Sequence, residues 1–140
     1  MAEENKMTDE MAEKEFLSWC EENELETDVS SMSEDQVTVF ESAKKKFMSL
    51  LKKGRLVVDA ECFDLTLSKF GAEGVAGTTI HVGHPDGKLW IGMDGKKDTE
   101  KMHKTQQAIS ALIGKDVGWI SKMDAKDWGF LSQVVALFLV

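Results

Sequence analysis

Histidines are the residues of this chain best suited to bind a metal ion. His81 and His84 lie three positions apart, and Asp86 or His103 is the candidate for a further ligand. Together they would approach the three or four ligands that zinc takes. Residues three apart on a strand point to opposite faces, so only a turn at Gly83 would bring both rings together. We therefore expect surface histidines at the end of a strand, with no bound metal and no cofactor.

The two cysteines, Cys20 and Cys62, are the candidate nucleophiles. They form no CxxC pair, and two cysteines in a chain of 140 residues do not make a disulfide framework. Two reduced thiols are typical of a cytoplasmic protein, in which a buried thiol acts as a small hydrophobic residue. Neither cysteine has the local signature of a catalytic nucleophile, and no pair of carboxylates stands out. The sequence therefore predicts no catalytic residue.

Three glycines, Gly71, Gly74 and Gly77, precede two threonines. A phosphate-binding loop of the GxxxxGK[ST] type needs a lysine that is missing here, and the GxGxxG spacing of dinucleotide-binding proteins is also absent. The segment is therefore predicted to be a flexible connection between strands.

Charge is distributed unevenly along the chain, whose formal net charge is −8. Residues 1–36 carry 13 acidic and 2 basic side chains, and the remaining residues carry 12 acidic and 15 basic side chains. We expect the acidic first helix to pair with a basic patch on the second. An acidic chain without a dense basic run is a poor candidate for binding nucleic acid. The patch comprises Lys44, Lys45, Lys46, Lys52, Lys53 and Arg55.

Hydrophobic periodicity predicts two helices in the first third of the chain. The first begins at Thr8 or Asp9 and ends at Glu22. The second begins after Ser33, which with Gln36 forms a capping-box pattern, and ends before Gly54. Residues 1–8 are expected to form a flexible tail of one domain that spans residues 1–140.

The rest of the chain changes period twice, first to strands and then back to helices. Residues 56–58, 63–67, 78–82 and 88–93 alternate as half-buried strands do. Residues 99–113 and a segment starting at Asp124 return to helical spacing. The predicted fold is therefore α+β, with two N-terminal helices, a roughly four-stranded antiparallel sheet and two C-terminal helices.

The last helix is apolar around most of its circumference, so it must be buried on more than one side. It is either the central helix of the core or a helix shared with another subunit. The apolar run over residues 130–140 is too short to span a bilayer, and the acidic N-terminus is not a signal peptide, so we expect no membrane contact. The residues that we expect at a protein interface are Trp119, Ile120, Trp128, Leu131, Val135 and Phe138.

The C-terminal third of the chain contains a sequence pattern that resembles one known family. Met123-Asp124-x-x-Asp127 leads into an apolar helix that ends in Phe138-Leu139. It resembles the carboxyl end of small tail assembly chaperones of long-tailed phages and prophages. The resemblance implies a small α+β protein that multimerises and coats a long helical tape measure protein, with no catalytic residue and no cofactor. The acidic N-terminal arm is not a feature of that family.

The sequence therefore predicts a cytoplasmic, non-enzymatic assembly or chaperone-like protein, which self-associates and binds a helical partner such as a tape measure protein. One alternative is an acidic adaptor or inhibitor that binds a basic protein. A further alternative is a small enzyme that uses Cys62, or His81 and His84. In that case a concave pocket would hold one of these residues beside a second polar group.

Overall fold

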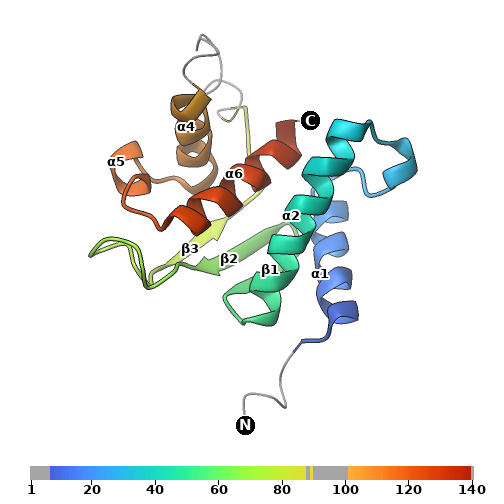
Figure 1. Ribbon diagram of the computed structural model, residues 1–140, viewed down its shortest axis with the longest axis horizontal. Helices are drawn as coiled ribbons and strands as arrows, with labels where there is room; N and C mark the ends of the chain where they lie inside the picture. The colour runs from blue at the N-terminus through green and yellow to red at the C-terminus, as the bar shows by residue number, and fades with distance from the viewer. Residues whose placement is uncertain (1–6, 88, 90–100, 140) are drawn as a thin grey trace.

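A computed structural model of the chain describes residues 7–87, 89 and 101–139 (Figure 1). The described part has an α+β fold, as predicted. Its elements in chain order are α1 (Asp9–Glu22), a 3-10 turn η2 (Val29–Ser31), α2 (Glu34–Lys52), β1 (Leu56–Asp59), β2 (Cys62–Thr66), β3 (Thr79–Val82), α4 (Lys101–Ile113), α5 (Val117–Ile120) and α6 (Ala125–Leu139).

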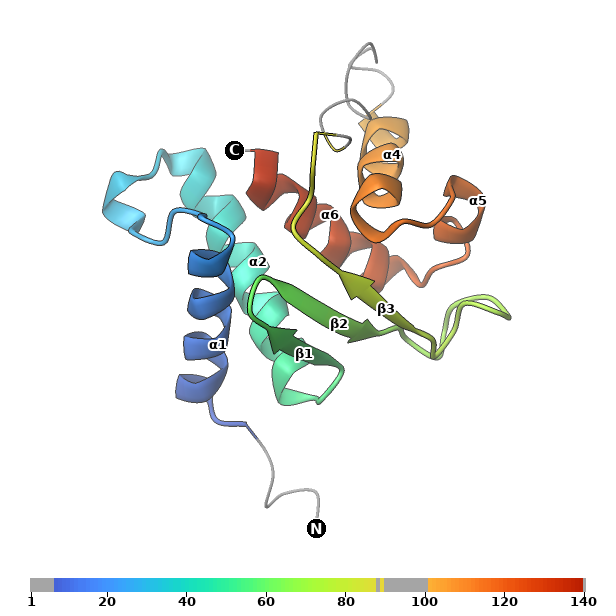
Figure 2. The same cartoon turned by 180° about the vertical axis from the view of Figure 1, so that it is seen from behind.

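The three described strands form one antiparallel sheet in the order β1-β2-β3. Helices α2 and α6 cross one face of this sheet, and the view from behind shows the opposite face uncovered (Figures 1 and 2). Helix α1 packs along α2, while α4 packs against α6 and α5. The core therefore lies between the sheet and the pair formed by α2 and α6.

Alternation along the strands determines which sheet face is buried. Leu65 of β2 is paired with Leu56 of β1 and with Ile80 of β3, and all three side chains are buried beneath the helices. The neighbouring row, Asp64 and its partner His81, is exposed on the open face. Because successive strand residues point to opposite faces, this register follows directly from the sequence pattern.

The ends of α2 confirm the predicted capping signals, and the structure shows a further cap at the start of α1. The hydroxyl of Thr8 accepts a hydrogen bond from the Met11 amide at the start of α1. Ser33 and Gln36 exchange both hydrogen bonds of a capping box at the start of α2. After α2, Gly54 has a φ of +75°, which glycine adopts without a steric penalty.

Three sequence predictions differ from the structure or lie outside its described part. The expected strand over residues 88–93 and the expected start of a helix at residues 98–99 fall on or among residues that are not described. The described residues therefore contain three strands where about four were expected. Residues 117–120, between the two predicted C-terminal helices, form the one-turn helix α5, so three helices follow the sheet instead of two. A short helix is possible there because the Asp116 side chain caps it at the Trp119 amide.

Two residues of the expected flexible tail over residues 1–8 have contacts with the folded part of the chain. Met7 packs against the core and Thr8 caps α1, whereas residues 1–6 lie outside the described part. Within the described residues, no helix combines the length and the apolar character that crossing a bilayer requires.

Candidate functional site

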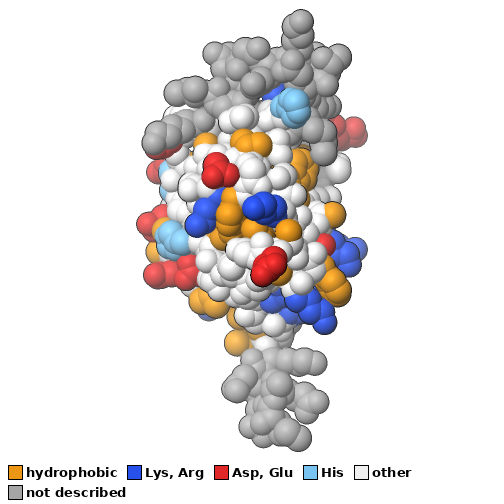
Figure 3. Space-filling view, turned by 90° about the vertical axis from the view of Figure 1, so that its left-hand side faces the viewer, with side chains coloured by type: hydrophobic (Ala, Val, Ile, Leu, Met, Phe, Trp, Pro, Cys, Tyr) orange, Lys and Arg blue, Asp and Glu red, His pale blue; other side chains and the backbone are white. Residues whose placement is uncertain are grey.

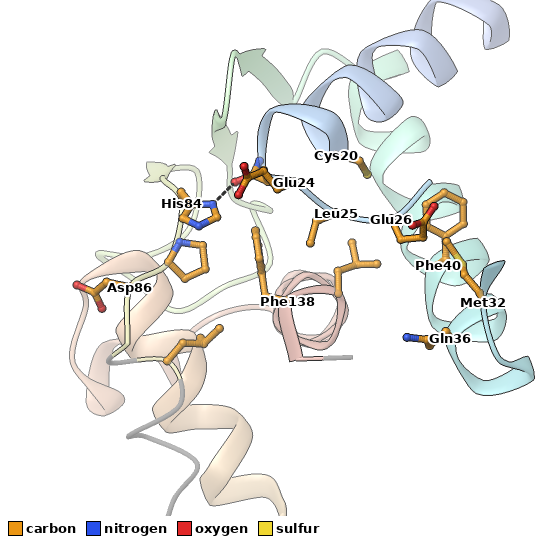
Figure 4. A pocket seen from close by; sticks show the side chains of 14 residues that line it. Cys20, Glu24, Leu25, Glu26, Met32, Gln36, Phe40, His84, Asp86 and Phe138 are labelled. Atoms are coloured by element: carbon orange, nitrogen blue, oxygen red, sulfur yellow. Dashed lines mark hydrogen bonds between the residues drawn. The ribbon is translucent and has the colours of Figure 1, made fainter. Parts of the chain in front are cut away.

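A cleft of about 470 Å³ opens where the end of α1, the start of α2 and the end of α6 meet (Figure 4). We call this feature the α1–α2–α6 cleft. Figure 4 shows His84 and Asp86 on one side and Met32, Gln36 and Phe40 on the other. The described residues that line the cleft are Cys20, Asn23, Glu24, Leu25, Glu26, Met32, Gln36, Phe40, His84, Pro85, Asp86, Leu89, Leu137 and Phe138.

The cleft has an apolar interior below an acidic rim. Leu25 and Phe138 project into its centre in Figure 4. Glu24, Glu26 and Asp86 are exposed around it, and none of its described lining residues is lysine or arginine. An opening of this composition offers apolar burial together with a negative potential, which is suited to an amphipathic cationic ligand.

Asn23 positions His84 at the rim. The Asn23 side chain is 3% exposed, and its Nδ2 donates to the carbonyl oxygens of Trp19 at 2.8 Å and Glu61 at 3.1 Å. Both amide hydrogens are thereby used, so Asn23 Oδ1 accepts a hydrogen bond from His84 Nδ1 at 2.7 Å. The neutral His84 ring therefore carries its proton on Nδ1, and Nε2 remains as its acceptor.

Phe138 holds the other side of the His84 ring. The two rings meet edge to face with centroids 5.6 Å apart, and Phe138 also contacts Trp19 edge to face at 5.8 Å. Buried Trp19 in turn anchors the last turn of α6 to α1. The His84 ring is therefore fixed by a hydrogen bond and an aromatic contact, which gives the cleft a preformed polar side.

The connection between α1 and α2, which forms a wall of the cleft, is ordered by its own side chains. Asp28 accepts hydrogen bonds from the amide and hydroxyl of Ser30 and from the hydroxyl of Ser31. These bonds hold the pKa of the Asp28 carboxyl below its usual value. Glu26 accepts a hydrogen bond from the Asp28 amide. Hydrogen bonds within residues 26–31 therefore hold this acidic segment in place.

The structure does not bring the histidines together. His81 lies on the open face of the sheet with Nδ1 2.7 Å from Asp64 Oδ1, whereas His84 turns to Asn23 at the cleft. His103 is exposed on α4. Among the described residues, no three histidine, cysteine or acidic side chains are grouped to hold a metal ion. The turn after β3 therefore separates the two rings.

Neither cysteine has the environment of an activated thiol. Burial, with a smaller contribution from Glu21, raises the pKa of Cys20 to about 12. Desolvation and the carboxylates of Glu61, Asp59 and Asp64 raise the pKa of Cys62. A raised pKa lowers the thiolate fraction at neutral pH, and the thiolate is the nucleophile. Cys20 lines the cleft as a protonated, apolar group.

Alkylation rates provide a test of these environments. At pH 8, iodoacetamide is expected to modify Cys62 more slowly than it modifies the same cysteine in the unfolded chain, and Cys20 more slowly still, because Cys20 is also 0% exposed. Mass spectrometry after timed quenching measures both rates, and the chain in urea supplies the reference. Labelling of native Cys20 at the unfolded rate would contradict the structure.

The predicted pairing between the first two helices is confirmed at two positions. Lys44 Nζ lies 2.7 Å from Glu13 Oε2, and Lys52 forms an ion pair with Asp9. These pairs join α1 to α2 along their exposed edge. Because they are solvent-exposed, each adds little to stability, but they neutralise part of the acidic first helix.

The six residues expected at an interface fall into two groups. Ile120, Leu131 and Val135 are 0%, 0% and 3% exposed in the chain's own core. The burial of Leu131 and Val135 shows that these apolar positions of α6 face the chain's own core. The other three are half-buried and pack against the core, namely Trp119, Trp128 and Phe138.

Trp119 belongs to α5, which lies on the left-hand side of the molecule in Figure 1, the side that Figure 3 faces. Hydrophobic side chains on this face are bordered by basic and acidic ones (Figure 3). The Lys115 ammonium stands 5.2 Å from the centroid of the Trp119 ring, a cation–π arrangement. The apolar surface around α5 is thus bordered by charge.

Sequence reasoning did not identify the cleft. Asn23 and His84 are 61 positions apart, and neither belongs to a motif that would link them. Exposed Phe70, at 74%, was likewise not singled out.

Comparisons of the chain with protein-family models, curated proteins and solved structures found no match. The function is therefore argued from the geometry and charge of the cleft.

Proposed function

We propose that this chain is a cytoplasmic, non-enzymatic assembly or chaperone-like protein, which self-associates and holds a helical segment of a partner in the α1–α2–α6 cleft. The observation that carries the proposal is the combination of an apolar interior and an acidic rim at one opening. The resemblance of the C-terminal third to phage tail assembly chaperones suggests a tape measure protein as the partner. Two unpaired cysteines are consistent with a cytoplasmic location.

The apolar lining of the cleft supports a helix as the ligand. An amphipathic helix presents apolar anchors at positions i, i+3 or i+4, and i+7, and grooves in binding proteins receive those anchors. Leu25, Met32 and Phe138 offer such anchors a mixed aliphatic, thioether and aromatic surface. Methionine adapts to different apolar shapes, so a site that includes Met32 suits helices of varied sequence.

The charge of the rim determines the polar side of the proposed ligand. Glu24 and Glu26 are exposed on the segment between α1 and α2, beside the apolar interior. Lysine or arginine flanking the apolar anchors of the ligand would meet these carboxylates. Such pairs increase the association rate and are weakened by salt.

Self-association is assigned to surfaces outside the cleft. Trp119 and Trp128 are half-buried, and Phe70 is 74% exposed on the loop between β2 and β3. Tryptophan and phenylalanine are enriched in the buried centres of protein interfaces. These side chains therefore supply apolar area for a contact between copies.

Sedimentation velocity tests both parts of the proposal. The chain alone is expected to sediment faster as its concentration rises. A fluorescent peptide of about 20 residues, with leucines on one helical face and lysines on the other, is expected to co-sediment with it. A strict monomer that binds no helical peptide would overturn the proposal.

Charge variants test whether the peptide binds at the cleft. The double substitution Glu24→Lys and Glu26→Lys is expected to weaken peptide binding about tenfold at low salt. Glu73→Lys is the matched control for Glu24→Lys alone, because Glu73 is exposed on the distant loop between β2 and β3 and both single substitutions change the net charge equally. Equal loss in the control would mean that binding follows net charge alone.

An acidic adaptor is the second candidate, and one observation favours it. Asp9 and Glu13 are paired with lysines of α2. Glu21, Glu22 and Glu24, at and just after the other end of α1, are exposed and form no ion pair with a lysine among the described residues. A scrambled peptide of the same composition separates the two functions. Equal binding of the scrambled and amphipathic peptides would favour the adaptor, since only charge is then recognised.

A further inference from the structure

A second cavity, of about 330 Å³, lies at the opposite end of the α2–α6 pair from the cleft. The two helices run antiparallel here, because the second half of α2 meets the first turns of α6. We call this cavity the basic pocket. Its lining residues are Lys46, Ser49, Leu50, Lys53, Arg55, Lys126, Asp127 and Phe130.

Of the four cations around the basic pocket, Arg55 alone forms an ion pair with another described residue. Asp127 is 3% exposed, and its Oδ1 accepts a hydrogen bond from Arg55 Nη2 at 2.7 Å. Its Oδ2 accepts one from the Ser68 amide at 2.7 Å, so both oxygens are engaged. Within the described residues, no carboxylate lies within ion-pair distance of the ammonium groups of Lys46, Lys53 or Lys126.

The contrast within α2 shows that this excess charge is local. Lys44 and Lys52 pair with acidic residues of α1, while Lys46 and Lys53 are seven positions apart and share the face toward α6. A Cβ atom added at Gly129 would lie 3.6 Å from Lys46 Nζ, so this ammonium reaches across to α6. Lys126, in the first turn of α6, places a third ammonium where the helix dipole is already positive.

Three like charges around one cavity repel one another, and a multiply charged anion would relieve that repulsion. Ser49 adds a hydroxyl donor, and Leu50 and Phe130 form an apolar floor beside the charges. The volume falls in the lower range for sites that hold small organic ligands. A dianionic phosphate joined to a small apolar group matches the charge, the size and the floor.

We propose that the basic pocket binds the phosphate group of a small phosphate monoester. The ammonium groups of Lys46, Lys53 and Lys126 contact the phosphate oxygens, and Phe130 contacts the organic group. Phosphate monoesters and inorganic phosphate share the same charged chemistry, and the organic group distinguishes them. The basic pocket shares no lining residue with the α1–α2–α6 cleft, so this proposal does not depend on the proposed function.

Isothermal titration calorimetry and two-dimensional NMR test the proposal with three probes, phenyl phosphate, inorganic phosphate and benzenesulfonate. Phenyl phosphate is expected to bind saturably and to shift the resonances of residues around the pocket. Inorganic phosphate is expected to bind more weakly because it lacks the ring, and benzenesulfonate more weakly because it carries a single charge. Equal binding of phenyl phosphate and benzenesulfonate would overturn recognition of a dianion, and equal binding of phenyl phosphate and inorganic phosphate would overturn the monoester.

Lysine variants locate the site. Lys53→Gln and Lys126→Gln are each expected to weaken phenyl phosphate binding about tenfold. Lys45→Gln is the matched control, because Lys45 is exposed on α2 but lines a different surface beside Asp9 and Glu13. Equal loss with Lys45→Gln would overturn the site. Salt-sensitive binding of a single-stranded oligonucleotide, without binding of phenyl phosphate, would also overturn it and assign the lysines to a nucleic-acid backbone.

Discussion

Replacing Phe47 with alanine is expected to lower the free energy of unfolding by about 3–5 kcal/mol. Phe47 is 0% exposed, and its ring centroid lies within 6.0 Å of those of Phe16, Trp19, Phe63 and Phe130. These partners come from α1, β2 and α6, so Phe47 joins three elements to α2. A cavity enclosed by three separate elements cannot collapse without moving one of them, which places the loss at the upper end for core truncations.

Urea denaturation, followed by circular dichroism and tryptophan fluorescence, measures this loss. Phe70→Ala, compared at a concentration at which the chain is monomeric, is the control, because Phe70 is 74% exposed and its ring contact within the chain is the Lys69 ammonium at 5.2 Å. Its effect is expected to stay within about 0.5 kcal/mol. If Phe47→Ala does not fold, Phe47→Leu replaces it in the comparison, and a smaller decrease in the free energy of unfolding is expected. Equal effects at positions 47 and 70 would contradict the packing.

Asp127→Ala is expected to lower the free energy of unfolding by about 2–4 kcal/mol. The Asp127 carboxylate connects α6 to the turn before β1 through Arg55, and to the loop after β2 through the Ser68 amide. Removing it leaves Arg55 Nη2 and the Ser68 amide without their acceptor, while Arg55 Nε still donates to the Thr66 carbonyl oxygen. Arg55 is 29% exposed at its side chain and regains some hydration, which keeps the loss below that of a fully buried pair.

Two further variants show whether the loss of stability in Asp127→Ala comes from the burial of the carboxylate and its contact with Arg55. Asp64→Ala removes the exposed side-chain contact with His81 on the open face of the sheet, and its effect is expected to be below about 1 kcal/mol. A double-mutant cycle with Arg55→Met is expected to show a total loss smaller than the sum of the single losses, because the guanidinium is then no longer left unpaired. Strict additivity would mean that Arg55 and Asp127 are not coupled.

The sequence by itself determined most of the local structure. Thr8 and Ser33 mark the starts of the first two helices, because a capping side chain bonds to amides only two or three residues away. Alternation over residues 63–67 places Phe63 and Leu65 on the buried face of β2, and the acidic and basic stretches predict the pairing of α1 with α2. These features depend on spacing within one element or on complementary charge of neighbouring helices.

The resemblance in the C-terminal third predicts a function but no binding site. The candidate sites depend on contacts between residues that are distant in the sequence. The pair Asn23 and His84 is separated by 61 positions, and the pair Arg55 and Asp127 by 72. Neither residue of a pair signals the other, since hydrogen-bond partners of this kind follow from how helices pack on the sheet. Only the tertiary structure therefore identified the cleft.

The same argument applies to the lysines and to the last helix. The sequence shows one basic patch, and the neighbours of α2 divide it, because α1 supplies carboxylates to Lys44 and Lys52 while α6 adds Lys126 beside Lys46 and Lys53. The apolar circumference of α6 left open whether a second subunit covers it. Tertiary packing decided this for Leu131 and Val135, because the sheet, α2 and α4 surround α6 and exclude water from residues that periodicity alone can only call apolar.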